Sequence, residues 1–276
     1  MFENEFAASV AISAHKALIY EVLAAPKPGL VDRFGSGAHK DMDVFSFVDS
    51  AEAILPYLYL CAKTGVEQSE RPELLLGMLR PAGVEAEKAM FEATGGVNTH
   101  KGAIFSMGII CAAAGVCGEK ASAEDICLMA GRIAAPVTAD FAESDLAPQT
   151  AGEKLHAAEG LNGVRGEAAA GFPSLRETAL PAMRKALNEG VSINDAAVLT
   201  LAALVLRSED TTFIKRCAGR DPSPYLKSVE NALASDKPTE ALQETDRLWS
   251  EAGLSAGGCA DLLALTLFLH FHLKEQ

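Results

Sequence analysis

Apolar side chains recur at spacings of three and four along most of the chain, a pattern that predicts amphipathic α-helices. In residues 5–23, for example, Phe6, Val10, Ala14 and Val22 fall on one helical face. The same spacing predicts helices over residues 44–61, 72–93, 98–114, 122–141, 174–189, 192–207, 221–234 and 239–251, and from residue 262 onwards. Alternating runs of β-branched residues are few, so the sequence predicts an all-α fold in which residues 1–276 form a single domain.

The predicted helix at 98–114 is apolar around most of its circumference, so we expect it to be central and buried. Asn98 or Thr99 would cap its start, and His100 and Lys101 would then lie in its first turn. Cations are unfavourable there for the helix itself, but an anion is favourable. The segment is therefore either an anion site or a helix–helix turn with two solvated cations.

Local signals place other helix ends. Asp43 suits the N-cap of the helix at 44–61, and Ser122 opens a capping box. Proline and glycine at 81–83 predict a break inside the segment 72–93. At the other end of the chain, His270 and His272 are two residues apart and face different ways, which predicts a frayed, solvated helix end.

Breaks rich in glycine and charge separate the predicted helices. Alternate helix ends meet on one side of a bundle, so these breaks would gather into one pocket. Such a pocket would hold both cations and carboxylates, a combination that suits a nucleotide polyphosphate with its divalent metal. The five breaks cover residues 26–43, 94–102, 160–173, 208–216 and 256–261.

Charge and composition narrow the partners. The formal net charge is -13 at pH 7, which argues against nucleic acid and against anionic membrane surfaces. The most apolar run, at 262–269, is too short to span a bilayer. None of the six cysteines forms a Cys-x-x-Cys pair, and no signal peptide is recognisable, so we expect a cytoplasmic protein.

Carboxylates within the breaks are candidate metal ligands. Asp41 and Asp43 are two residues apart, so in extended chain their side chains lean the same way and could share a divalent cation. Arg165 has the planar donor fork that binds phosphate. Glu87 either faces solvent or points at the turn before the central helix. Asp261 is either a helix cap or a buried ligand group.

Several runs together resemble the triphosphoribosyl-dephospho-coenzyme A synthase family, over nearly the whole chain. PKPGLVD at 26–32 and TGGVNTHKG at 94–102 are long and highly specific, and GAHKDMD at 37–43 supports them. GVRGEA at 163–168, GFP at 171–173 and GG with ADLLA at 257–264 fit the same family. The chain departs from the family pattern in the C-terminal half, at residues 210–212, 216–219 and 256–259.

The resemblance implies an all-helical enzyme that joins the triphosphoribosyl part of ATP to dephospho-coenzyme A and releases adenine. Its product is the precursor of the prosthetic group on the acyl carrier subunit of citrate lyase or malonate decarboxylase. Displacement of adenine from an anomeric carbon implies an oxocarbenium-like transition state. The triphosphate then needs Mg²⁺ and cations, the acceptor hydroxyl needs a general base, and the leaving adenine benefits from a proton donor.

Site residues follow from these needs. Asp32 and Glu167 are the acid/base candidates, and their individual roles stay open. Asp41, Asp43 and Asp210 are the candidate Mg²⁺ ligands. The expected contacts to ATP or the acceptor come from Lys27, Gly29, His39, Asn98, Thr99, His100, Lys101 and Arg165.

Two other classes of function stay open. One is a metal-dependent helical hydrolase of ADP-ribosyl-type N-glycosidic bonds, with water as the acceptor. The other is a non-catalytic helical partner of a lyase or decarboxylase complex, in which the C-terminal departures have removed activity. Macromolecular partners left open are a carrier-protein transferase, such a complex, and a second copy of the chain as a homodimer.

Overall fold

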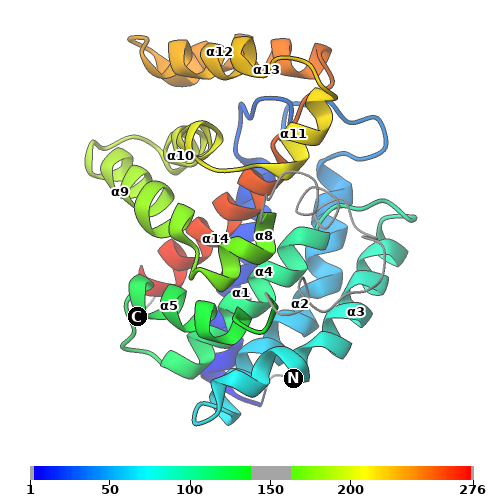
Figure 1. The fold of residues 1–276 in the computed structure, drawn as a ribbon, viewed down its shortest axis with the longest axis vertical. Helices are drawn as coiled ribbons and strands as arrows, with labels where there is room; N and C mark the ends of the chain where they lie inside the picture. The colour runs from blue at the N-terminus through cyan, green and yellow to red at the C-terminus, as the bar shows by residue number, and fades with distance from the viewer. Residues whose placement is uncertain (1–2, 138–162, 275–276) are drawn as a thin grey trace.

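The structure is a computed structural model that describes residues 3–137 and 163–274. Within these ranges every regular element is a helix and no strand occurs, which confirms the all-α prediction (Figure 1). The predicted helix end at 141 and the first residues of the break at 160–173 lie outside the described residues. The helices pack around one hydrophobic core as a single domain.

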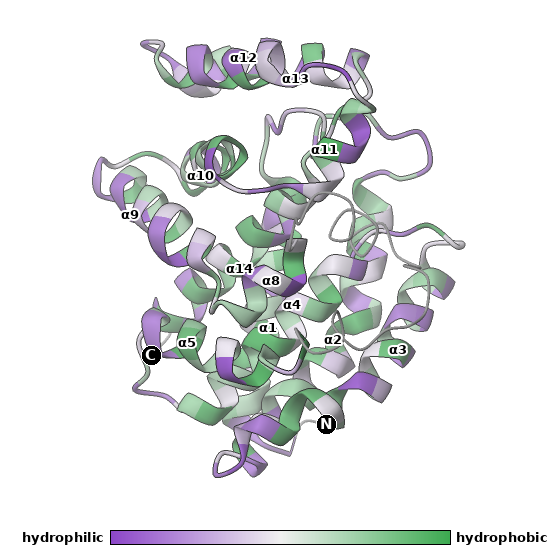
Figure 2. Ribbon diagram, in the orientation of Figure 1, coloured by the Kyte–Doolittle hydropathy of each residue, from purple (hydrophilic) through white to green (hydrophobic). Residues whose placement is uncertain are grey.

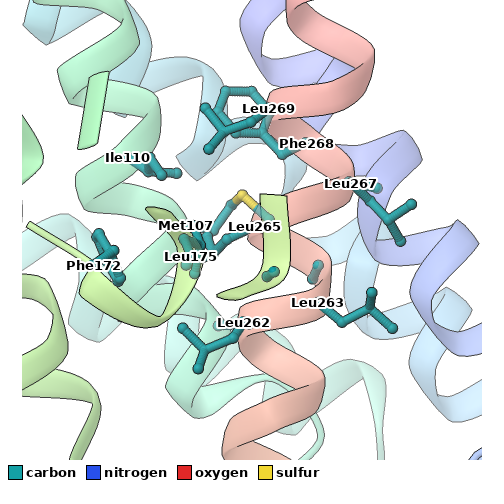
Figure 3. Packing of buried hydrophobic residues seen from close by; sticks show 14 of the residues in the cluster. Met107, Ile110, Phe172, Leu175, Leu262, Leu263, Leu265, Leu267, Phe268 and Leu269 are labelled. Atoms are coloured by element: carbon teal, nitrogen blue, oxygen red, sulfur yellow. The ribbon is translucent and has the colours of Figure 1, made fainter. Parts of the chain in front are cut away.

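Long apolar helices form the centre. α4 (Lys101–Cys117) packs mainly against α2 (Val44–Glu67), and α1 (Glu5–Leu23) lies between α2 and α14 (Gly257–Lys274). α4 and α14 are buried along most of their length, which confirms the central position expected for the helix after the second break. Figure 3 shows buried side chains of both helices in one hydrophobic cluster, among them Met107 of α4 and Leu265 of α14.

The other helices surround this centre. α3 packs against α2, and α9 and α10 pack against each other, while α12 and α13 form a pair at one end of the molecule (Figure 1). Figure 2 shows hydrophilic residues concentrated on outer helices such as α3 and α9. The remaining helices are η1 (Pro72–Leu74), α3 (Leu75–Ala93), α5 (Ala123–Ala134), α8 (Gly163–Ala169), η2 (Leu175–Ala179), α9 (Leu180–Asn188), α10 (Ile193–Arg207), α11 (Thr211–Cys217), α12 (Ser223–Leu233) and α13 (Pro238–Glu251).

Two predicted caps are confirmed and one is displaced. Asp43 caps α2 and Ser122 caps α5, each in a reciprocal capping box. α4 begins at Lys101, so His100, rather than Asn98 or Thr99, occupies its N-cap position. The Asn98 carboxamide still accepts the backbone N–H of Lys101 at 3.2 Å, so it satisfies one free amide of the first turn.

Two further predictions were wrong. α3 runs through Pro81 without a break. Both Pro81 and Gly77 are exposed, so water can bond the carbonyl that the proline leaves without a partner. His272 is not solvated: it is 2 % exposed and stacks on Phe268 at 5.5 Å between ring centroids.

The cysteines and the long helices bear on the environment of the protein. All six cysteines are free thiols. α1 and α2 would be long and apolar enough to cross a membrane by length and composition alone, but buried core helices share that property. Here both helices pack against α4, within the core.

Candidate active site

A cavity of about 390 Å³ opens where the polar breaks meet. Every one of the five breaks contributes to its lining, as the bundle argument predicted. The last turn of α1 and the first turns of α4 and α14 complete the walls. One lining residue from each break, in chain order, is Lys27, Asn98, Glu167, Asp210 and Gly258.

Gly29 shapes the first break without lining the cavity. Its φ is +67°, and a Cβ there would lie 1.8 Å from the carbonyl oxygen of Leu254. Its N–H donates to the Asp246 carboxylate at 2.9 Å. Only glycine lets this loop approach the segment before α14 so closely. The expected substrate contact at Gly29 therefore stays a prediction, while its structural role is direct.

Asp32 organises the same loop. Its carboxylate is buried and accepts backbone N–H groups from Lys27 at 3.1 Å, Phe34 at 2.7 Å and Gly35 at 3.2 Å. It is not among the residues that line the cavity. Asp32 thus fixes where the Lys27 backbone lies, and its predicted acid/base role has no geometric support from the cavity.

A buried ion pair forms part of the cavity wall. Lys27 and Glu21 are 1 % and 4 % exposed, and the Lys27 ammonium donates to the Glu21 carboxylate. Burial raises the pKa of Glu21, and the nearby ammonium opposes that rise. Sequence reasoning missed Glu21, although the residue continues the apolar face of α1, three positions after Leu18. A carboxylate on a buried face was the available signal.

His100 is a neutral donor or acceptor and not the cation that the sequence led us to expect. It is 3 % exposed, and burial, with a smaller effect from Lys27, lowers its pKa to about 3. Its Nδ1 lies 2.7 Å from the Ser50 hydroxyl oxygen, and its ring meets Phe47 edge-on. The ring is thereby held so that Nε2 is left for another partner.

Buried polar atoms without a partner gather at this cavity. Among the described residues, five buried side-chain nitrogen or oxygen atoms have no hydrogen-bond partner. Four of them belong to cavity-lining residues: Thr99 Oγ1, His100 Nε2, Ser208 Oγ and Ser255 Oγ. An unpaired buried polar atom is costly, so their concentration here indicates a site built for a polar ligand.

The first turns of α4 and α14 meet across the cavity. A Cβ on Gly102 would lie 2.1 Å from the Asp261 carboxylate, so glycine is needed for this approach. Burial, with Glu21 and Asp210 nearby, holds the pKa of Asp261 well above its usual range. Asp261 lies inside α14, which begins at Gly257, so it is not the cap of this helix, and its side chain lines the cavity.

Asp210 connects two helices at the cavity. One carboxylate oxygen accepts the Phe213 N–H at 2.8 Å and caps α11, and the other accepts the Cys259 N–H at 2.8 Å. Burial raises its pKa. The break at 208–216 is therefore partly helical, because Asp210 starts α11 inside it.

Glu167 and Arg165 lie on the short helix α8. Glu167 lines the cavity, accepts hydrogen bonds from the Ser174 hydroxyl and N–H, and has a pKa raised by burial. A raised pKa suits a carboxyl group to the role of proton donor. Arg165 is not among the lining residues, although Gly163 and Val164 are, so its phosphate contact stays a prediction.

Cations other than Lys27 lie nearer the mouth of the cavity. Lys101 pairs with Glu87 at 2.8 Å, which settles where Glu87 points. Arg216 lies 3.2 Å from His39 Nδ1, and both residues line the cavity. Burial, then Arg216, lowers the pKa of His39, so this ring is a neutral partner. Sequence reasoning missed Arg216 because a short helix carries it into the site.

The predicted metal ligands are only partly brought together. Asp41 and Asp210 line the cavity. Asp43 does not, and its carboxylate accepts hydrogen bonds from the backbone and hydroxyl of Ser46. Within residues 3–137 and 163–274 no group of three or more His, Cys, Asp or Glu side chains is placed to hold a metal ion. Among the described residues, the cavity therefore offers single carboxylates as possible ligands and no ready-made set of three.

Comparison with known proteins identifies the family. The family described as CitG, ATP:dephospho-CoA triphosphoribosyl transferase, matches residues 7–276. A 2-(5″-triphosphoribosyl)-3′-dephosphocoenzyme-A synthase of Pectobacterium atrosepticum is 38 % identical over 264 residues, which cover 94 % of this chain and 87 % of that protein. A probable enzyme of the same name from Lactiplantibacillus plantarum is 36 % identical, over 93 % of this chain and 94 % of its own.

A third relative is longer. Protein CitXG of Leuconostoc mesenteroides is 36 % identical over 274 residues, which cover 93 % of this chain and 57 % of that protein. No solved structure was found to match. The family match spans nearly the whole chain, and the resemblance seen in the glycine-rich runs is confirmed. The chain belongs to the CitG family of ATP:dephospho-CoA triphosphoribosyl transferases.

Proposed function

We propose that this chain transfers the triphosphoribosyl group of ATP to dephospho-coenzyme A, with release of adenine, in the cavity between the five breaks. The observation that carries the proposal is the set of unpartnered buried polar atoms on the cavity wall. These atoms suit the hydroxyls and ring nitrogens of a nucleotide. Lys27 and Arg216 line the same cavity and suit its phosphates.

Two lining residues have the chemistry for the leaving group and the phosphates. Glu167 would protonate the departing adenine, because it lines the cavity and burial raises its pKa. Arg216 would fork onto the triphosphate, released from its contact with the neutral His39 ring. Lys101 would contribute less, since Glu87 already offsets its charge.

Mg²⁺ fits this site only together with the triphosphate. Magnesium in nucleotide sites is commonly held by one or two carboxylates, with phosphate oxygens and water completing the shell. Asp41 is exposed at the cavity and Asp210 keeps free lone pairs beside its two backbone bonds, so these two residues would hold the ion. When bound, Mg²⁺ would neutralise part of the phosphate charge next to an acidic protein.

Titration calorimetry of ATP with and without Mg²⁺ tests this assignment. Asp41→Asn should lose most of the Mg²⁺ stimulation of ATP binding. Asp43→Asn is the matched neighbour, and its carboxylate is engaged in the cap of α2. Equal stimulation in both variants would place the metal elsewhere.

The product would pass to another protein. We propose that it is the precursor of the prosthetic group of a lyase or decarboxylase acyl carrier, loaded by a separate transferase. The relative CitXG, in which the similar stretch makes up 57 % of the protein, supports an association with a second activity. The free thiols support our proposal of a reducing compartment, the cytoplasm.

Chromatography of adenine tests the activity itself. Incubation with ATP, Mg²⁺ and dephospho-coenzyme A should release adenine and produce one larger nucleotide in equal amount. Omission of dephospho-coenzyme A should abolish adenine release. Adenine without the acceptor would indicate the hydrolase, and no adenine under any condition would indicate a non-catalytic partner.

A further inference from the structure

A purely structural role does not explain why the Glu21–Lys27 ion pair lies on the cavity wall. Both side chains are almost fully buried, and both line the cavity. A buried ion pair contributes little net stability, because desolvation of the two charges offsets their attraction. Apolar residues of similar size would serve the core of α1 as well. The position of the pair on the cavity wall is the feature that a packing role leaves unexplained.

Lys27 is held ready for a second partner. The Asp32 carboxylate accepts hydrogen bonds from the backbone N–H groups of Lys27, Phe34 and Gly35, and these bonds fix the loop. The Lys27 ammonium therefore projects from a rigid turn. Among the residues that the structure describes, the Lys27 ammonium donates one hydrogen bond, to Glu21, and an ammonium has three N–H donors. Two donors therefore remain for an anion that enters the cavity.

We propose that Glu21 is the general base that takes the proton from the acceptor hydroxyl, with Lys27 pairing it until a substrate phosphate arrives. This inference rests on the proposed transfer reaction. The triphosphate attracts the ammonium, and the carboxylate of Glu21 is then left beside the reacting hydroxyl. A base that is neutralised in the free enzyme and exposed in the complex acts only when ATP is present.

The step balances without another reactant. Glu21 accepts the hydroxyl proton, the hydroxyl oxygen bonds to the anomeric carbon, and the carbon–nitrogen bond breaks. Its electron pair leaves with adenine, which takes up one proton from Glu167. Overall one proton passes from the hydroxyl to adenine. Glu21 ends the step protonated and Glu167 ends it ionised, and proton exchange with solvent restores both carboxyl groups.

The charges around Glu21 support this role. Lys27 pairs with Glu21, the charges of Asp32 and Asp261 act on it from nearby, and His100 close to Lys27 is neutral. Burial raises the pKa of Glu21 above its usual range, and the Lys27 ammonium opposes that rise. Burial, with Glu21 and Asp210 nearby, also raises the pKa of Asp261 well above its usual range.

Glu21→Gln tests the proposal, because an amide oxygen still accepts from Lys27 but cannot take a proton. We expect adenine release to fall roughly 10²–10⁴-fold in kcat, the usual contribution of a general base, with ATP affinity unchanged. Glu21→Asp keeps the carboxylate and should retain more activity than Glu21→Gln, although Gln matches the size better. Glu240→Gln, in an exposed ion pair on α13, is the control.

Outcomes separate this proposal from the function on which it rests. If the wild-type protein releases no adenine, the transfer reaction is wrong, and Glu21 has no proton to take. If the wild type is active and Glu21→Gln equals or exceeds Glu21→Asp, Glu21 is not the base. Should Glu21→Gln fail to fold, Glu21→Leu/Lys27→Met buries no unpaired charge; a folded double variant with wild-type kcat overturns the proposal.

Discussion

The cavity has two sides that differ in how they hold charge. The buried wall consists of Glu21, Lys27, His100 and Asp210, each at most 6 % exposed. The exposed rim consists of Asp41, Asn98, Lys101 and Glu209, which face solvent. On the wall every charge or ring has a fixed partner, whereas the rim carries side chains that water and salt can reach.

This difference decides which residues can do chemistry. In a low-dielectric wall a charged form is costly: burial, with a smaller effect from the Lys27 charge, lowers the pKa of His100 to about 3. On the rim the same charges are screened, so they attract and orient a substrate with little effect on one another. Each variant below breaks or sharpens this comparison, beginning with the largest expected effect.

Lys27→Met should be the most damaging change. It leaves the Glu21 carboxylate buried without a partner, and breaking a buried pair in this way costs about 3–5 kcal/mol. Urea unfolding should show that loss, and adenine release should vanish. Adding Glu21→Leu should restore most of the free energy of unfolding without restoring activity. A double variant that stays as unstable as Lys27→Met would contradict the pairing.

Gly102→Ala should separate activity from stability on the wall. The new Cβ would occupy the space of the Asp261 carboxylate, 2.1 Å away, and push it from its position. Overpacking typically lowers the free energy of unfolding by about 1–3 kcal/mol. Adenine release should fall by more than this loss of stability explains. The control is Gly77→Ala, which meets nothing within 4 Å. Equal activity in the two variants would remove Asp261 from the site.

These residues also show how far the sequence could predict the site. Asp43 and Ser122 were recognised as caps because a cap depends only on the next three residues. The gathering of the five breaks followed from the up-and-down path of a helical chain. His100 was taken for a cation because its burial depends on Ser50 and Phe47, some fifty residues earlier in the chain.

The same limit explains why the sequence pointed to Asp32 and not to Glu21. Asp32 lies in a highly specific motif, but its carboxylate accepts hydrogen bonds from the loop backbone, whereas Glu21 lines the cavity. Which of two nearby carboxylates points inwards depends on the path of the loop between them. The prediction at Pro81 failed for a similar reason. Whether this proline breaks the helix depends on the solvent exposure of the carbonyl four residues earlier.

Ser255→Ala should change stability and binding in opposite directions. Its hydroxyl is buried, has no partner among the described residues and lines the cavity. Removing an unsatisfied buried hydroxyl should leave the free energy of unfolding unchanged or raise it, because a desolvation cost disappears. ATP or dephospho-coenzyme A should bind more weakly by about 0.5–1.5 kcal/mol, the net value of one hydrogen bond. Calorimetry measures the affinity and urea unfolding measures the stability of the same preparation. A loss of both would mean that Ser255 has a structural role.

Lys101→Ala should be the mildest change, because it alters only the rim. The side chain is 46 % exposed and already paired with Glu87 at 2.8 Å, so a phosphate must compete with that carboxylate. Exposed pairs are worth about 0–1 kcal/mol, and we expect the affinity for ATP to fall by no more than that. The loss should shrink as salt is added, since the rim is screened, whereas the effect of Lys27→Met should not. Calorimetry at two salt concentrations measures both. An effect of Lys101→Ala that is large and independent of salt would mean that Lys101 turns inwards when ATP binds, and that the wall and rim of the free protein are not those of the complex.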